Sequence, residues 1–393
     1  MSRQRRNILN NTLHNARAFL AELWTREVKY VESDDYWENG EADDYSETIE
    51  RAILNSPTAS RASVLFAKFI HGAGLTVDVD FGEDFLSDKV RDISRNLAIQ
   101  GGSWIHRSVK YDADKDMFVT DKIEVMNYHY MRKGKADDDD NEGRIYLRDK
   151  HKDLQNLTKE NTPWFYPFSN NQEIIKAQIE ADAKDKDAET IAEKLNHYRG
   201  QVYYINTTSD FIYAISPFDS VFNDMDTEYR VSLYTNKVFR SGFLGKKIFL
   251  FKEQDPLGMG KDGEVDEFED VNEHMKNLIQ SWMGAENSDS VFVSSVSSTD
   301  DIDDFMKVIN VESDFNEDMF RDSVSRLRRN ILGAASGLPE ALVFSNDNGL
   351  FSGSGEQVVE LKKFYNEQTE AYRFIINKSL KKLGFDTEII ELV

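Results

Sequence analysis

The chain has no cysteine among its 393 residues, so it lacks the side chain that forms disulfides, thiolate metal sites and cysteine nucleophiles. This composition fits a reducing compartment. No apolar run approaches the ~20 residues of a membrane-spanning helix. Residues 1–23 begin basic and lack a continuous apolar segment with a small-residue cleavage site, which argues against a secretory signal. We therefore expect a soluble protein that is made in the cytosol.

Positive charge is scarce, since 48 Lys and Arg face 71 Asp and Glu, giving a net charge of −23. This balance argues against a protein that grips nucleic acid by releasing counterions. It is compatible with a protein that encloses DNA without holding it, because like charge weakens adhesion to phosphates. Hydrophobic residues make up 40% of the chain and aromatic residues 12%, which predicts a folded protein, and the length allows two or three domains.

Two long helical patterns flank a polar, glycine-rich segment near the C-terminus. In the first pattern, Phe320, Val324, Leu327 and Ile331 recur at helical spacing. The second pattern has apolar residues near one face at Val358, Leu361, Phe364 or Tyr365, Tyr372, Ile375 and Leu383. Gly333, Gly337 and Pro339 are expected to end the first helix. The segment that joins them is longer than a typical connection between two helices. We interpret it as a functional loop that acts on a molecule moving past it.

The rest of the chain predicts a mixture of helices and strands. Residues 31–48 are acidic and read as a solvated linker or as an arm that meets a basic partner. The expected helices are 8–23, 48–69 with a break at Ser56-Pro57, 84–99 with a stop at Gly101-Gly102, 173–198, 217–242 and 271–284. The expected strands are 75–81, a β-meander over 103–149 with turns at Asp112–Asp116 and Lys135–Gly143, and a hairpin of 201–206 with 210–216. Further strands are expected over 243–253, 290–296, 305–311 and 387–393. Residues 159–168 are expected to form a loop packed onto a core.

One acidic segment resembles a calcium-binding loop. Counting from Asp138, the residues Asp140, Glu142 and Asp149 fall where an EF-hand places ligands, and Gly143 falls at its glycine. Its flanks read as strands, however, and Asp149 replaces the usual final Glu. A hairpin tip is the favoured interpretation, and we expect no cofactor and no metal.

Catalytic motifs are missing from the sequence. The histidines form no pair at metal-ligand spacing, and His129 and His151 lie in or beside the meander. No G-x-S-x-G elbow and no G-x-x-x-x-G-K-[ST] loop is present. These patterns favour a protein that is not an enzyme.

A basic cluster stands out in this acidic chain. Arg321, Arg326, Arg328 and Arg329 lie on the first of the two C-terminal helical patterns. They could form ion pairs along the helix or between subunits, with residues such as Glu317 and Asp322. Alternatively, they could form a ring of positive charge that faces a phosphate backbone once subunits assemble.

The order of several strings resembles the portal protein family of tailed double-stranded DNA phages. SPFDSVFNDMDTEYRVSLYTNKVFRSGFLGKKIFLF (216–251) resembles the first stem helix running into the clip domain, and DFNEDMFRDSVSRLRRNILGAASGLP (314–339) resembles the second stem helix. ALVFSNDNGLFSGSGEQ (341–357) resembles the tunnel loop. KFIHGAGLTVDVD, LAIQGGSWIHRSVKYD and GRIYL resemble the N-terminal wing. The likeness is clearest over residues 209–383.

The resemblance implies an α+β, portal-like fold with a crown that is minimal or absent. The implied parts are a wing (1–208), a strand and first stem helix (209–241), a small α/β clip (242–312), a second stem helix (313–337), a tunnel loop (338–355), and a C-terminal helix with a terminal strand (356–393). In the tunnel loop, the residues implied to face DNA are Asn346, Asp347, Asn348, Phe351 and Ser352.

The resemblance also implies a function. Twelve copies would form a ring at one capsid vertex of a virion, made in the host cytoplasm, and double-stranded DNA would pass through it without tight binding during packaging and ejection. The implied partners are the major capsid protein, the terminase packaging motor and the head–tail adaptor, with no membrane. Two other hypotheses remain open: another structural virion component, such as an adaptor or baseplate protein, and a metal-dependent hydrolase.

Overall fold

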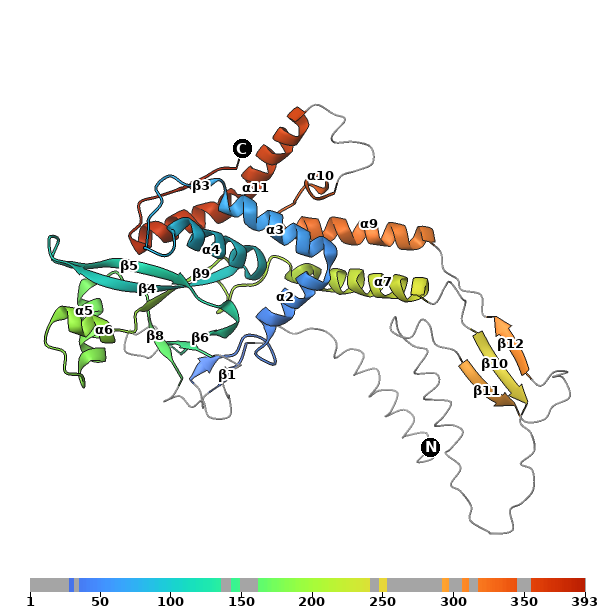
Figure 1. Ribbon diagram of the computed structural model, residues 1–393, viewed down its shortest axis with the longest axis horizontal. Coiled ribbons are helices and arrows are strands. Elements are labelled where there is room, and N and C mark those ends of the chain that lie inside the picture. Colours follow the sequence, from blue (N-terminus) through green and yellow to red (C-terminus); the bar gives the residue numbers. More distant parts are fainter. Residues whose placement is uncertain are drawn as a thin grey trace, which may run out of the picture. The chain divides into compact units, whose positions relative to one another are not determined.

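The computed structural model describes residues 28–31, 35–135, 143–148, 162–240, 247–252, 292–296, 306–310, 317–344 and 355–392. Helices and sheets occur in separate stretches of the chain, so the described residues form an α+β protein (Figure 1). The chain divides into two compact units. Unit 1 comprises residues 1–54, 59–220 and 332–393, and unit 2 comprises residues 55–58 and 221–331.

Unit 1 is built on a six-stranded sheet with the order β5-β4-β9-β8-β7-β6. The strands are β4 (Gly102–Asp112), β5 (Met117–Val125), β6 (Met131–Lys133), β7 (Ile145–Leu147), β8 (Trp164–Pro167) and β9 (Gln201–Asn206). Neighbouring strands are antiparallel except β8 and β9, which are parallel. The expected turn between β4 and β5 is confirmed, because the Asp112 carboxylate accepts hydrogen bonds from the backbone N–H groups of Asp114 and Lys115.

Seven helices and four short strands accompany this sheet among the described residues. The helices are α2 (Tyr45–Asn55), α3 (Pro57–His71), α4 (Leu86–Gln100), α5 (Gln172–Ala183), α6 (Ile191–His197), α10 (Glu340–Val343) and α11 (Gly355–Leu383). The strands pair as β1 (Tyr30–Val31) with β2 (Tyr36–Trp37), and β3 (Gly74–Leu75) with β13 (Ile389–Ile390). The expected break at Ser56-Pro57 is confirmed, since α2 ends before it and α3 begins there. A 3-10 turn, η1 (Tyr128–Tyr130), precedes β6.

The end of α4 depends on a glycine. Gly101 has φ of +72°, and its N–H donates to the Leu97 carbonyl, which closes the last turn. A Cβ at this position would lie 2.2 Å from the carbonyl oxygen of Ile215. Only glycine therefore combines this backbone conformation with this close approach, as the expected helix stop at Gly101-Gly102 requires.

Helix α11 packs on α3 through aromatic side chains. Tyr365 contacts Phe69 and Tyr372 contacts Phe66, both edge to face. The sequence left Phe364 and Tyr365 as alternatives for the buried face; Tyr365 is buried and Phe364 is exposed. The hydroxyl of Tyr365 also donates to the Ala335 carbonyl at 2.7 Å, which ties α11 to the segment before α10.

Unit 2 contains α7 (Phe222–Arg240), most of α9 (Glu317–Ala334), and a three-stranded sheet between them in sequence. The strands are β10 (Lys247–Lys252), β11 (Phe292–Val296) and β12 (Met306–Asn310), in the order β11-β10-β12. Strand β10 is parallel to β11 and antiparallel to β12. The expected strands are present, whereas the expected helices 8–23 and 271–284 lie outside the described residues.

Several expectations about unit 1 are wrong. The strands within 103–149 do not form the expected β-meander, because β5 and β6 lie at opposite edges of the six-stranded sheet. Residues 210–216 do not form a strand after β9, because β9 already pairs on both edges with β4 and β8. Instead, the backbone N–H groups of Ala214 and Ile215 donate to the side chains of Tyr204 and Thr208. The stretch 159–168 contains a strand, β8, where a loop was expected. Within the expected strand 75–81, Leu75 of β3 pairs with β13, and Asp80 forms an isolated bridge with Phe85.

Another error concerns the helix expected over 173–198. It is two helices, α5 and α6, because Thr190 caps a new helix by accepting from the Glu193 N–H while Glu193 accepts from the Thr190 N–H.

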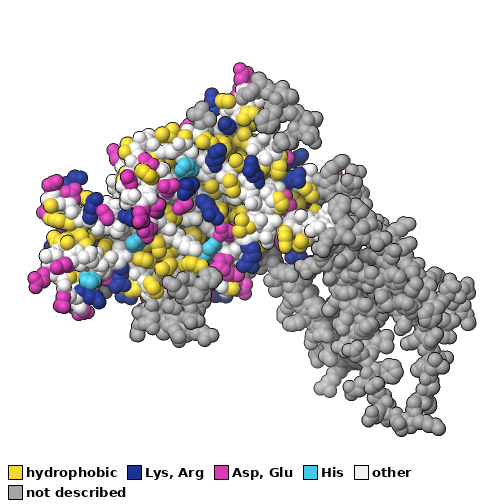
Figure 2. Space-filling model, viewed as in Figure 1, with side chains coloured by type: hydrophobic (Ala, Val, Ile, Leu, Met, Phe, Trp, Pro, Cys, Tyr) yellow, Lys and Arg dark blue, Asp and Glu magenta, His cyan; other side chains and the backbone are white. Residues whose placement is uncertain are grey.

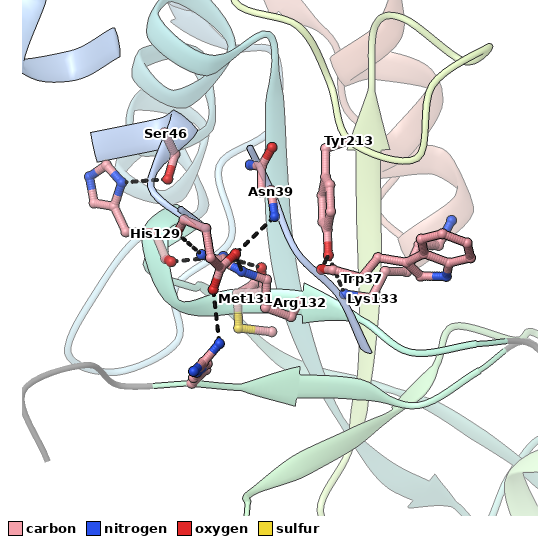
Figure 3. Close-up of polar contacts among 10 residues, drawn as sticks. Trp37, Asn39, Ser46, His129, Met131, Arg132, Lys133 and Tyr213 are labelled. Carbon is pink, nitrogen blue, oxygen red and sulfur yellow. Dashed lines mark hydrogen bonds and ion pairs between the residues drawn. The ribbon is translucent and has the colours of Figure 1, made fainter. Parts of the chain in front are cut away.

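The acidic stretch 31–48 is part of the fold rather than a solvated linker. Asp43 is 4% exposed, and its carboxylate pairs with Arg132 at 2.5 Å and Arg148 at 3.1 Å (Figure 3). Arg132 also donates to the carbonyls of His129 and Met131. The Asn39 N–H donates to the same carboxylate at 2.8 Å. This buried ion pair joins the segment before α2 to strands β6 and β7.

Replacing Asp43 by Asn is expected to lower the free energy of unfolding by on the order of 3 kcal/mol, because Arg132 is then a buried cation that lacks this carboxylate. Asn keeps the side-chain shape and tolerates the φ of +55° found at this position. Chemical denaturation of both proteins measures the difference.

The matched control is Asp121→Asn, which removes an exposed carboxylate 3.2 Å from Lys110 and should cost less than about 1 kcal/mol. Equal losses in the two variants would contradict the structural role of the Asp43 pair.

Candidate functional site

The loop residues expected to face DNA lie outside the described residues. These residues are Asn346, Asp347, Asn348, Phe351 and Ser352. The weak calcium candidates Asp138, Asp140, Glu142 and Asp149 also lie outside them. Within the described part of the chain, no cluster of three or more His, Cys, Asp or Glu side chains is arranged to hold a metal ion.

The basic cluster lies on α9, whose apolar side is buried. Leu327 is 5% exposed and Ile331 is fully buried, as the helical spacing predicts. Arg326 and Arg329 are exposed and Arg328 is partly buried, while the Arg321 side chain is outside the described residues. Three of the four arginines can therefore be placed, and two of them face away from the packed side of the helix.

The ion pairs considered for this cluster are only partly testable. Asp322 is exposed one turn before Arg326, and no ion pair joins them. Among the described side chains, Arg326 and Arg329 have no carboxylate partner. Glu317 belongs to α9, but its side chain is outside the described residues. For Arg326 and Arg329, a contact between subunits, a surface that faces phosphate and an ion pair with a residue outside the described part all stay open.

Helix α7 lies beside α9 and is fixed by two polar contacts within unit 2 (Figure 1). Asn330 on α9 donates to the Asp224 carboxylate on α7 at 3.0 Å. The buried carboxylate of Glu228 accepts from the hydroxyls of Ser56 and Thr58 and from the Thr58 N–H. Since Thr58 is in the first turn of α3, Glu228 satisfies donors that the helix start leaves without intrahelical partners.

The end of α9 is a tight reversal of the kind that the Gly-Leu-Pro string predicts. Ser336 and Gly337 both have positive φ, of 54° and 68°. The N–H of Gly337 donates to the Gly333 carbonyl, and the N–H of Leu338 donates to the Leu332 carbonyl. Pro339 then precedes α10, so the helix cannot continue.

A polar hollow that sequence reasoning missed lies beside η1. It encloses about 390 Å³ and is lined by side chains of α2 and α4 and by His129. His129 Nε2 lies 2.5 Å from the Glu50 carboxylate, and Nδ1 lies 3.0 Å from the Ser46 hydroxyl (Figure 3 shows the Ser46 contact). Ser46, His129 and Glu50 resemble the Ser–His–acid triad of a serine hydrolase. However, Ser46 is only 1% exposed, so its hydroxyl does not face a substrate. His129 thus joins η1 to α2.

Acidic and basic side chains are intermixed on the face of the described chain in Figure 2, and no single-sign field dominates it. Within the described residues, no helix is long and apolar enough to cross a membrane.

No protein-family model matches the chain. No curated protein matches it either. Among solved structures, it is similar to a chain in the neck of a native gene transfer agent particle, with 11% identity, a TM-score of 0.47, and coverage of 93% of this chain and 86% of that chain. It is also similar to a phage portal protein of the HK97 family from Corynebacterium diphtheriae, with 10% identity, a TM-score of 0.40, and coverage of 92% and 96%. A phage portal protein is among its structural relatives. That protein belongs to the family that the order of sequence strings resembles.

The Glu50–His129 pair predicts a pH-dependent contribution to stability. The hydrogen bond from His129 holds the pKa of the Glu50 carboxyl below its ordinary value of 4.5. A carboxyl whose pKa is lowered by folding contributes fully above its unfolded pKa, and the contribution is lost as the pH falls through the folded pKa. The loss of unfolding free energy caused by Glu50→Gln should therefore be largest above pH 4.5 and shrink below it. Denaturation curves over this pH range measure it, and a difference that does not vary with pH would contradict the pairing.

Proposed function

We propose that this chain is a portal-type protein of a phage-like particle. Copies of it form a ring, on the order of twelve as in the family it resembles, at one capsid vertex, and double-stranded DNA passes through the ring during packaging and ejection. The observation that carries the proposal is the organisation of unit 2. Two long helices, α7 and α9, lie side by side and enclose in sequence a separate small sheet, β10–β12.

A helix pair of this kind suits the wall of a channel. The buried residues Leu327 and Ile331 give α9 one packed side. The contacts of Glu228 and Asn330 fix α7, so each copy would contribute a rigid pair of helices to a ring. The segment after α9 reverses at Gly337 and Pro339 and leads, beyond α10, into the loop expected to project into the channel.

The charge distribution suits a conduit rather than a clamp. DNA that must slide in both directions would be stalled by many phosphate contacts, since each released counterion adds affinity. A net charge of −23 opposes such binding. Arg326 and Arg329, exposed and without a carboxylate partner among the described side chains, would supply sparse positive charge along the channel. In the loop, Asn346, Asp347, Asn348, Phe351 and Ser352 would touch DNA without gripping it.

The partners in this proposal are other copies of the chain, the major capsid protein, the terminase packaging motor and the head–tail adaptor. The sheet β10–β12 belongs to the part that would meet the motor and later the adaptor. The protein itself would carry out no catalysis.

Purified full-length protein is expected to form closed rings with a central channel, because each copy presents the same rigid helix pair to its neighbours. Negative-stain electron microscopy and mass measurement at low and high salt test this. Monomers of 45.3 kDa under every salt condition would contradict the proposal.

The double variant Arg326→Glu, Arg329→Glu separates the two interpretations of the arginines in the same experiment. Rings should persist if these side chains face the channel, and should be lost if they pair with a neighbouring copy. Lys115→Glu, in the exposed β4–β5 turn, is the matched control for the change of charge.

A further inference from the structure

A second hollow lies over strands β6–β9 of unit 1 and has a charge unlike that of the chain as a whole. We call it the aromatic–lysine hollow; it encloses about 440 Å³ and its principal side chains are Lys133, Phe168, Tyr203, Asn206, Phe211 and Lys382. Among the described residues that line it, none is an Asp or Glu. The polar hollow beside η1 is lined by Glu50 and Asp92. The aromatic–lysine hollow is therefore suited to an anion.

The two lysines come from distant parts of the chain and both are exposed. Lys133 ends β6, and Lys382 lies in the last turn of α11. Neither forms an ion pair with any described side chain, whereas the neighbouring Lys381 pairs with Glu388 at 2.6 Å. Their ammonium groups are therefore available to a ligand.

A buried arginine lies behind the Phe168 wall of the hollow and adds positive charge there. Arg107 is 3% exposed and lies 5.3 Å from the centroid of the Phe168 ring. Its hydrogen-bond partners among the described residues are neutral, including the side chains of Thr120 and Asn170. Burial lowers the pKa of the Arg107 guanidinium, but an arginine keeps its charge at neutral pH. No described carboxylate compensates this buried cation, so it contributes positive potential to the hollow.

The same network holds Lys382 in position. The Asn170 side chain accepts from Arg107 at 3.2 Å and donates to the backbone carbonyl of Lys382 at 2.9 Å. The end of α11 is thereby fixed to the sheet, and the lysine is held at the rim rather than left on a free helix end.

The remaining walls are aromatic. Phe211 is 54% exposed, which leaves much of its ring free for a ligand. The rings of Phe168 and Tyr203 meet edge to face at 5.0 Å, and Lys382 Nζ lies 5.7 Å from the Tyr203 ring. The Asn206 side chain is occupied by contacts to Phe211 and Thr208, so it has little capacity to read the edge of a base.

We propose that the aromatic–lysine hollow binds a nucleotide, with the base against Phe211 and the phosphate between Lys133 and Lys382, and with little preference for one base. Stacking on an aromatic ring tolerates every base, and lysines attract phosphate without demanding a geometry. The volume lies within the range of small-molecule sites. A duplex keeps its bases stacked inside, so the hollow takes a free nucleotide or an unpaired strand.

Fluorescence titration of the full-length protein tests this with AMP, labelled oligo(dT), adenosine, inorganic phosphate and a blunt duplex. AMP or oligo(dT) should bind saturably and more tightly than adenosine, phosphate or duplex. Tighter binding of AMP identifies a free nucleotide as the ligand, and tighter binding of oligo(dT) identifies an unpaired strand. No saturable binding of either, or adenosine bound as tightly as AMP, would overturn the proposal.

Substitutions locate the binding. Phe211→Ala should weaken it about tenfold. The salt dependence of oligo(dT) binding should have a slope of about −1.4 on logarithmic axes for two lysine–phosphate contacts, falling to about −0.7 in Lys382→Ala. Phe374→Ala and Lys381→Ala change exposed residues outside the hollow and serve as controls. Since all four changes are at the surface, circular dichroism should show an unaltered fold. Equal affinities in Phe211→Ala and Phe374→Ala would refute the site.

Discussion

The buried pair of Asp43 with Arg132 is the contact on which the N-terminal part of unit 1 depends. The two residues are 89 positions apart in sequence, and their contact joins the segment before α2 to β6. The Arg132 guanidinium also binds backbone carbonyls around η1, so one carboxylate organises both sides of this junction. Removing two charges from water is costly, and such a pair is retained only where the geometry and additional hydrogen bonds are good. Here Asn39 and Arg148 complete the set of donors.

The placement of basic side chains connects this buried ion pair to the proposed portal function and to the proposed nucleotide site. In this acidic chain, Lys and Arg are outnumbered by Asp and Glu. Several of the basic side chains are either buried in the fold or lie at specific surfaces. Arg132 stabilises unit 1, and Arg326 and Arg329 lie exposed on α9. Lys133 and Lys382 border a hollow whose described lining residues include no carboxylate. In the portal proposal the excess of negative charge keeps DNA mobile. The few exposed basic side chains then determine where a phosphate group of the DNA can bind briefly.

Local patterns predicted the parts of the fold whose stability is local. Helices α4, α7, α9 and α11 were predicted because one apolar stripe faces a packed side, and the β4–β5 hairpin was predicted from alternation and an Asp-rich turn. Strand β8 was missed because its identity depends on β9, more than 30 residues later. The segment 210–216 was wrongly predicted as a strand because its apolar and polar residues alternate. Both edges of β9 are already paired, with β4 and β8, so the segment cannot pair there.

The candidate sites show the same limit. The arginines of α9 could be found from the sequence because they all lie within one helical pattern. The Glu50–His129 pair and the aromatic–lysine hollow could not, because their members come from different helices and strands. Asp43 was assigned to a solvated linker, since an acidic run does not reveal that one of its carboxylates meets a buried arginine.

The absence of cysteine makes one direct measurement of the assembly straightforward. A single cysteine placed at Arg329, and separately at Lys115, can be spin-labelled, and pulsed electron paramagnetic resonance then gives distances between equivalent sites of different copies. If α9 lines a channel in a closed ring, labels at position 329 should give a set of distances between copies that is shorter than the set at position 115, in the β4–β5 turn. Longer distances at 329 than at 115, or no distances between copies at either site, would contradict the account.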